Sequence, residues 1–134
     1  MKQADNIYLD HAAGTFLLPE VREYLSTWLS AKTANPSSIH KEGRLAAAAL
    51  DSARQMIAES IGAKPSEIIF TSGGTEANNL AILGGAYSLK GKGNHVLTCK
   101  TEHPSILESF KQLKKDGFRV TYLVPDSHGQ IDLD

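Results

Sequence analysis

Two short polar segments of this chain carry residue types that could bind a phosphorylated ligand. The first is Ser-Gly-Gly-Thr at residues 72–75, which follows an apolar run and precedes residues that favour a helix. A turn that leads into a helix exposes unpaired backbone N–H groups at the positive end of the helix dipole, and phosphates bind well there. Glycine lets the backbone approach a ligand closely, and Thr75 adds a hydroxyl donor. The segment therefore predicts a phosphate site.

The spacing of the glycines argues against two common nucleotide sites. No Gly-Lys-Ser/Thr ends the segment, as a P-loop requires, and the G-x-G-x-x-G spacing of a dinucleotide site is absent. We therefore expect a small phosphate ester rather than a nucleotide. The alternative is a plain turn between a strand and a helix, in which glycine only permits a sharp bend.

The second segment is Thr-Glu-His-Pro-Ser at residues 101–105, between a predicted strand and a predicted helix. Ligands of parallel α/β sheets bind outside the carboxyl ends of the strands, so His103 and the glycine turn are expected to face one crevice. An imidazole can stack on a flat ring and can move protons near neutral pH. The alternative is a helix-capping or surface histidine, but the coincidence with the glycine turn favours a functional role.

The histidines and the cysteine of the chain do not predict a metal site. The five histidines show no H-x-x-x-H spacing, and the single cysteine, Cys99, cannot build a structural zinc site. Cys99 lies within a predicted strand, where we expect a buried, small hydrophobic residue rather than a nucleophile. One cysteine also allows no internal disulfide, which fits a reducing, cytoplasmic setting.

The elements that must position these segments follow from hydrophobic periodicity and from Gly and Pro. Helices are expected from Pro19 to about residue 29, over 41–61, over 75–89 (weakened by Gly84-Gly85) and over 104–115. Strands are expected over 68–71, 95–99 and 119–124. Alternating strands and helices predict an α/β fold with a mostly parallel sheet and crossover helices.

Composition and the chain ends add further expectations. The chain has 134 residues with 14 basic and 15 acidic side chains, so we expect neither a nucleic-acid surface nor a membrane-surface helix. No run approaches the ~20 apolar residues of a membrane span, and the polar N-terminus is unlike a signal peptide. Residues 131–134 could begin another helix, so we expect the front part of a larger protein; the alternative is a short frayed tail.

Five segments occur in an order that is familiar from one family. They are Tyr-Leu-Asp-His-Ala-Ala at 8–13, Asn-Pro-Ser-Ser-Ile-His at 35–40, the stretch 68–79, Glu-His-Pro at 102–104 and Gly-Gln-Ile-Asp at 129–132. Together they resemble the cysteine desulfurases of the NifS/IscS type, within the class-V aminotransferase family of pyridoxal-phosphate (PLP) enzymes. The resemblance covers the whole chain and implies part of the large domain of a fold-type-I PLP transferase.

The resemblance also implies roles for particular residues. Gly74 and Thr75 would bind the PLP phosphate, and His103 would stack on the pyridine ring and assist proton transfer as the catalytic residue present here. Residues 1–40 would hold an N-terminal arm, a helix and an active-site or dimer loop, and residues 41–134 the first, incomplete part of the PLP-binding domain. Gly14 departs from the family, in which Thr is frequent at that position.

The implied function is that of the N-terminal part of a PLP-dependent cysteine desulfurase. Such an enzyme converts L-cysteine to L-alanine and leaves sulfur on itself for iron–sulfur cluster assembly or thiolation, as a cytoplasmic homodimer that serves a sulfur-acceptor or scaffold protein. The family's Schiff-base lysine, pyridine-binding Asp, substrate-binding arginine and sulfur-accepting cysteine lie downstream of these residues, so we expect the chain alone to be inactive. Two alternatives stay open, namely a fragment of a selenocysteine lyase or another class-V aminotransferase, and a non-catalytic dimerisation module.

Overall fold

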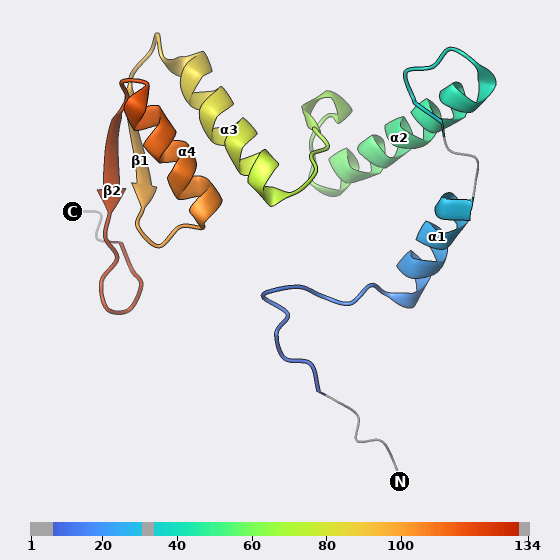
Figure 1. Ribbon diagram of the computed structural model, residues 1–134, viewed down its shortest axis with the longest axis horizontal. Helices are drawn as coiled ribbons and strands as arrows, with labels where there is room; N and C mark the ends of the chain where they lie inside the picture. Colours follow the sequence, from blue (N-terminus) through green and yellow to red (C-terminus); the bar gives the residue numbers. More distant parts are fainter. Residues whose placement is uncertain (1–6, 31–33, 132–134) are drawn as a thin grey trace. The chain divides into compact units, whose positions relative to one another are not determined.

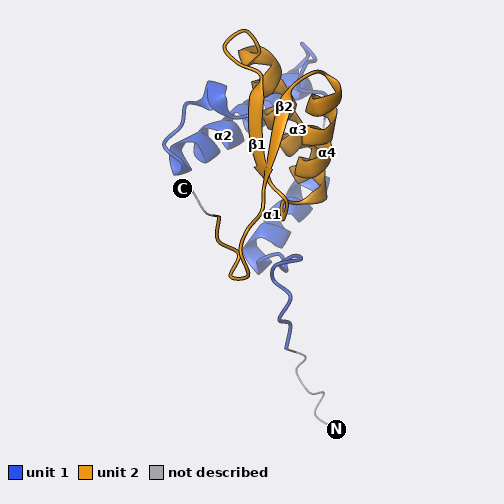
Figure 2. Cartoon of the chain, turned by 90° about the vertical axis from the view of Figure 1, so that its left-hand side faces the viewer, with its two compact units in different colours: residues 1–68 blue, residues 69–134 orange. Residues whose placement is uncertain are grey.

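The computed structural model describes residues 7–30 and 34–131. Along the chain, helices come first and the two strands follow, on either side of α4 (Figure 1). They are the α-helices α1 (Pro19–Ser30), α2 (Lys41–Ser60), α3 (Gly74–Leu89) and α4 (Pro104–Lys115), the short 3₁₀ helix η1 (Pro65–Glu67), and the strands β1 (His95–Cys99) and β2 (Arg119–Leu123). The chain divides into two compact units, residues 1–68 and residues 69–134, which Figure 2 colours separately.

Unit 1 is organised around α2. His40 is the N-cap residue of this helix, and its Nδ1 accepts a hydrogen bond from the Gly43 N–H at 3.2 Å. At the other end, Gly62 has a φ of +67°, and the N–H of Ala63 donates to the carbonyl of Ala58 at 2.8 Å. This arrangement is a Schellman motif, and it ends the helix close to residue 61, where the sequence predicts its end.

Unit 2 is a βαβ unit preceded by α3. The strands β1 and β2 are parallel, with His95 opposite Arg119 and Cys99 opposite Leu123, and α4 makes the crossover between them. Both α3 and α4 begin on the side toward which the strand arrows point (Figure 1). Gly117 ends α4 with a φ of +89°, so that Phe118 turns back and its N–H donates to the carbonyl of Leu113 at 3.0 Å.

A small apolar core lies in unit 2 between these elements. Leu113 is fully buried, and Phe110 and Phe118 are nearly so. Phe110 and Leu113 are three residues apart on one face of α4, which is the spacing of a helix that buries one side. The packing of α4 in this core fixes the position of the helix in unit 2, and with it the position of His103 at the start of the helix.

The strand predicted over residues 68–71 is not formed, and this prediction is wrong. Ile68 has an extended backbone, with φ −94° and ψ 126°. A β-strand also requires a neighbour with which its N–H and C=O groups can form a ladder, and none pairs with this segment within the described residues. The sheet of the described residues therefore has two strands rather than three.

Other expectations have mixed outcomes. The helix predicted over residues 75–89 is confirmed, because α3 ends at Leu89 and is continuous through Gly84 and Gly85. Cys99 is partly exposed rather than buried, and its Sγ lies 3.0 Å from the Thr101 hydroxyl oxygen. The start of the helix predicted at the C-terminus falls mostly on residues 132–134, which lie outside the described residues. None of the described helices combines the length and the hydrophobicity that crossing a bilayer requires.

Candidate functional site

The glycine turn leads directly into α3, as predicted. Gly73 is the N-cap residue, and its carbonyl accepts the first helical hydrogen bond from Ala77 at 3.1 Å. Helical residues therefore begin at Gly74 and Thr75, whose N–H groups lie in the first turn, where a helix has no internal acceptors for them. The backbone thus provides the donors that a phosphate requires at the positive end of the helix dipole.

Glu76 holds the turn in shape from the first turn of α3. Its Oε2 accepts hydrogen bonds from the Ser72 hydroxyl at 2.7 Å and from the Ser72 N–H at 2.6 Å. These two bonds, the hydroxyl one first, hold the pKa of Glu76 below its usual range. The carboxylate is therefore engaged with Ser72 in its charged form, and it closes the turn from residue 72 to the helix.

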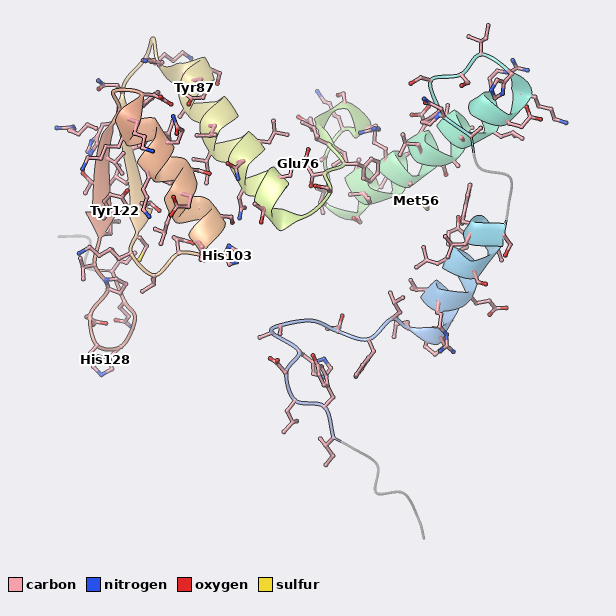
Figure 3. The ribbon with its side chains drawn as sticks, in the orientation of Figure 1. Met56, Glu76, Tyr87, His103, Tyr122 and His128 are labelled. Carbon is pink, nitrogen blue, oxygen red and sulfur yellow. The ribbon has the colours of Figure 1, made fainter. Side chains whose placement is uncertain are left out.

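His103 is the N-cap residue of α4, at the end of the loop that follows β1. Its Nδ1 accepts a hydrogen bond from the Ser105 N–H at 3.2 Å and lies 2.8 Å from the Ser105 hydroxyl oxygen. The ring itself is exposed, and Figure 3 shows it at the start of α4. The helix-capping role that the sequence analysis treated as an alternative is thus present, and it sets the orientation of the imidazole.

A pocket of about 360 Å³ brings the predicted site residues together. Gly74 and Thr75 of α3 line it together with His103, so the two segments singled out from the sequence share one hollow. Asn78 and Ser105 complete the lining, and sequence reasoning missed both. Their spacing could have indicated them, because Asn78 lies one helical turn after Gly74 and Ser105 lies two residues after His103.

A second hollow, of about 600 Å³, lies among α3, β1 and α4 and has a different character. Apolar side chains such as Ile82, Leu97 and Phe110 form most of its wall. Among the described residues that line it, Lys92 and His95 carry polar side chains, but none of the lining residues belongs to the first turn of a helix, where unpaired N–H groups could bind a phosphate, so we do not assign the ligand site to it. Among the described residues, no group of His, Cys, Asp and Glu side chains is arranged to hold a metal ion.

The polar residues of the N-terminal segments have local roles within unit 1. The ring of His11 packs edge-on against Tyr8, with 5.1 Å between the ring centroids. His40 caps α2, and its Nδ1 lies 3.3 Å from the Glu42 carboxylate. The role of residues 35–40 near an active site stays a prediction.

Comparison with known proteins identifies relatives over nearly the whole chain. The family model described as aminotransferase class-V matches residues 7–134. The cysteine desulfurase IscS of Dictyoglomus turgidum is 52% identical over 128 residues, which are 96% of this chain and 32% of the relative. A putative cysteine desulfurase, IscS 1 of Bacillus subtilis, is 47% identical over 127 residues, which are 95% of this chain and 34% of that protein.

Solved structures agree with these relatives. A NifS-like protein matches with a TM-score of 0.82 at 34% identity, covering 90% of this chain and 33% of the other. SspA, solved in complex with cysteine, also matches with a TM-score of 0.82, at 42% identity, covering 93% of this chain and 36% of SspA. The chain thus spans about a third of the length of the curated relatives that it matches.

Proposed function

This chain belongs to the class-V aminotransferase family, and we propose that it forms the N-terminal part of a PLP-dependent cysteine desulfurase. The observation that carries the proposal is the pocket that Gly74, Thr75 and His103 line together. The names of the relatives agree with it, because several are called cysteine desulfurase IscS at 47–52% identity.

The donors of the pocket fit the chemistry of PLP. Its phosphate would accept hydrogen bonds from the N–H groups of Gly74 and Thr75 and from the Thr75 hydroxyl, with help from the α3 dipole. The exposed His103 ring is planar and can stack on a pyridine ring. When bound, PLP supplies the electron sink for chemistry at the α-carbon of an amino acid, while the protein binds and orients it.

We further propose that L-cysteine is the substrate and that its sulfur passes to the enzyme, leaving L-alanine. SspA, which resembles this chain, has been solved with cysteine bound. We also propose a cytoplasmic homodimer that serves a sulfur-acceptor or scaffold protein in iron–sulfur cluster assembly or thiolation. In it, residues 1–40 would supply an arm and a dimer loop, and residues 41–134 would begin the PLP-binding domain.

The 134-residue chain alone is proposed to bind PLP without turning over cysteine. The resemblance places the Schiff-base lysine, the sulfur-accepting cysteine and the other catalytic residues outside these 134 residues, and the chain covers about a third of its relatives. The one cysteine present, Cys99, bonds to Thr101 and is not among the residues that line the pocket.

Binding and turnover test this proposal separately. The chain is titrated with PLP while cofactor fluorescence is followed, with inorganic phosphate as a competitor, and sulfide is then measured after incubation with PLP and L-cysteine or L-selenocysteine. We expect saturable PLP binding that phosphate weakens, and no sulfide or selenide. Absence of any PLP binding would contradict the cofactor site and favour a dimerisation module, whereas turnover would contradict the proposed inactivity of the chain.

A further inference from the structure

Four polar side chains link the first two turns of α3 and of α4 beside the pocket. They are Asn78 and Asn79 of α3 and Ser105 and Ser109 of α4, and we call them the polar clasp. The Asn78 amide Nδ2 donates to the Ser105 hydroxyl oxygen at 2.9 Å. The Ser109 hydroxyl, which is almost fully buried, donates to Asn79 Oδ1 at 3.2 Å. The two helices are thus held together by paired side chains where the pocket residues lie.

The polar clasp reaches both parts of the candidate site. On α3, Asn79 Nδ2 donates to the carbonyl of Thr75 at 2.8 Å. Thr75 is the last residue of the glycine turn at residues 72–75, the predicted phosphate turn, so this bond braces the turn where it enters the helix. On α4, Ser105 contacts the His103 ring through both its N–H and its hydroxyl. The separation between the phosphate turn and the imidazole therefore depends on these inter-helix hydrogen bonds.

The donor and the acceptor can be assigned in each hydrogen bond from Asn78 through Ser105 to His103. A backbone N–H can only donate, so the bond from the Ser105 N–H makes His103 Nδ1 an acceptor. The Asn78 amide donates to the Ser105 hydroxyl oxygen, which leaves the hydroxyl proton for the same Nδ1 at 2.8 Å. A neutral imidazole whose Nδ1 accepts must carry its proton on Nε2.

The burial of these groups favours a fixed geometry. Asn78 and Ser105 are half-buried, whereas the ring of His103 is exposed. Water competes less with hydrogen bonds between half-buried groups, so the bonds made by Asn78 and Ser105 can fix the orientation of the ring even though its other edge faces solvent. Ser105 and Asn78 also line the pocket themselves.

We propose that Ser105 and Asn78 are positioning residues that hold the His103 ring at the pocket as the Nε2–H tautomer. This inference rests on the proposed function, because that function provides the flat ring against which His103 is held. The free edge of the imidazole then presents an N–H donor at Nε2. In this tautomer His103 can donate a hydrogen bond from Nε2. To accept one there, the ring must first move its proton from Nε2 to Nδ1 and give up its bonds from Ser105.

Nuclear magnetic resonance of the chain labelled with ¹⁵N in its histidines tests the inference without relying on activity. Long-range ¹⁵N–¹H correlations distinguish the Nε2–H from the Nδ1–H tautomer, and loss of one signal set in His103→Gln assigns the ring. The variants are Ser105→Ala, which removes the hydroxyl, and Ser105→Thr, which restores it. Ser88→Ala is the matched control, because the Ser88 hydroxyl donates to the carbonyl of Gly85 within its own helix.

We expect a single Nε2–H tautomer for His103 in the wild-type chain and in Ser88→Ala. In Ser105→Ala, Nδ1 keeps only the longer bond from the backbone N–H of residue 105, at 3.2 Å, and loses the hydroxyl at 2.8 Å. We therefore expect some Nδ1–H tautomer beside the Nε2–H tautomer and a PLP affinity about three- to tenfold weaker, with both values restored in Ser105→Thr. A structural role alone would not move the tautomer signals. Unchanged His103 signals in Ser105→Ala would overturn the inference, even if PLP still binds to the wild-type chain.

Two further results separate this inference from the proposed function. If the wild-type chain does not bind PLP but Ser105→Ala still changes the tautomer, the positioning role stands and the cofactor assignment fails. If Ser105→Ala loses its helical circular dichroism, Asn78→Ala provides the test, because it removes the α3 partner and leaves the cap of α4 in place. Unaltered His103 signals in a folded Asn78→Ala would contradict the role of Asn78.

Discussion

At the scale of single residues, His103 both caps a helix, which the sequence analysis gave as the alternative to a functional role, and lines the pocket. Its Nδ1 caps α4 through the Ser105 N–H, and the same ring lines the pocket with Gly74 and Thr75. The cap is what gives an exposed imidazole a defined orientation. The same ring therefore caps α4 and lines the pocket, and the cap fixes the orientation in which the ring lines the pocket.

The Thr75 hydroxyl provides a direct test of the phosphate turn. We expect Thr75→Val to weaken PLP binding by about three- to tenfold, because one hydrogen bond to a charged ligand is lost while the side-chain shape is kept. Thr75→Ser should retain most of the affinity. Fluorescence titration measures both, with Thr27→Val as the control, since the Thr27 hydroxyl bonds to Tyr24 within α1. Equal affinities for Thr75→Val and the control would argue against this turn as the phosphate site.

Two helical glycines provide a matched pair for stability. A Cβ on Gly43 would lie 2.3 Å from the Ser38 carbonyl oxygen, whereas a Cβ on Gly84 meets nothing within 4 Å. We expect Gly43→Ala to destabilise the chain by about 1–3 kcal/mol through this clash. Gly84→Ala should stabilise it by about 0.5–1 kcal/mol through helix propensity. Urea unfolding measures both, and a neutral Gly43→Ala would show that the loop before α2 moves freely.

At the scale of elements, α3 and α4 are joined at both ends. The polar clasp links their first two turns, and at the far ends the Tyr87 hydroxyl of α3 donates to the Asp116 carboxylate, which follows α4. The amino group of Lys90 lies 5.2 Å from the centre of the Phe118 ring near that end. Side-chain contacts at two levels thus hold the helix pair in a defined register.

The bond between Tyr87 and Asp116 should make stability depend on pH at both extremes. The hydrogen bond from Tyr87, followed by those from Gln112, holds the pKa of Asp116 below its ordinary 3.8. The contribution of the bond to the free energy of unfolding is therefore complete above pH 3.8, and it is lost as the pH falls through the lowered pKa of Asp116. The bond to Asp116 also raises the pKa of Tyr87 above 10.0, so the contribution is present below pH 10.0 and is lost as the pH rises through the raised value.

Comparison of the wild-type chain with Tyr87→Phe checks this dependence. We expect the difference in unfolding free energy to be constant between about pH 5 and pH 9 and to shrink beyond either limit. Tyr24→Phe serves as the control, because the Tyr24 ring packs on Trp28 and its hydroxyl is not part of this pair. A difference that is independent of pH would show that the hydroxyl does not bond to the carboxylate in solution.

At the scale of the whole molecule, few apolar side chains are buried. Among the described residues, the fully or nearly buried hydrophobic side chains are those of Ala58, Phe110, Leu113 and Phe118. Large side chains such as Leu9, Ile39 and Leu29 are more than four-fifths exposed. Burial of apolar surface is the main stabilising contribution to folding, so a chain with so little of it is expected to be only marginally stable.

The chain alone should therefore bind a hydrophobic dye and unfold gradually. We expect strong fluorescence with anilinonaphthalene sulfonate, and a broad thermal transition by circular dichroism, because exposed apolar patches bind the dye and a small core gives little cooperativity. Addition of PLP should sharpen the transition, since a ligand of the folded state stabilises it. A sharp transition without dye binding would contradict the small core.

The sequence by itself determined the features that depend on neighbouring residues. The bounds of β1 and α4 were predicted, because hydrophobic periodicity and Pro at the helix start act locally. The phosphate turn and His103 were singled out for the same reason. Their residue types and their places beside predicted elements are visible along the chain.

Only the tertiary structure decided the features that join distant parts of the chain. Residues 68–71 had the composition of a strand, but a strand also requires a pairing partner, and the described residues supply none. The bond between Asn78 and Ser105 joins residues 27 positions apart and arises from the packing of α3 on α4. The pocket lining and the orientation of His103 depend on that packing, because a contact between two helices is set by how they lie together and not by the residues adjacent in sequence.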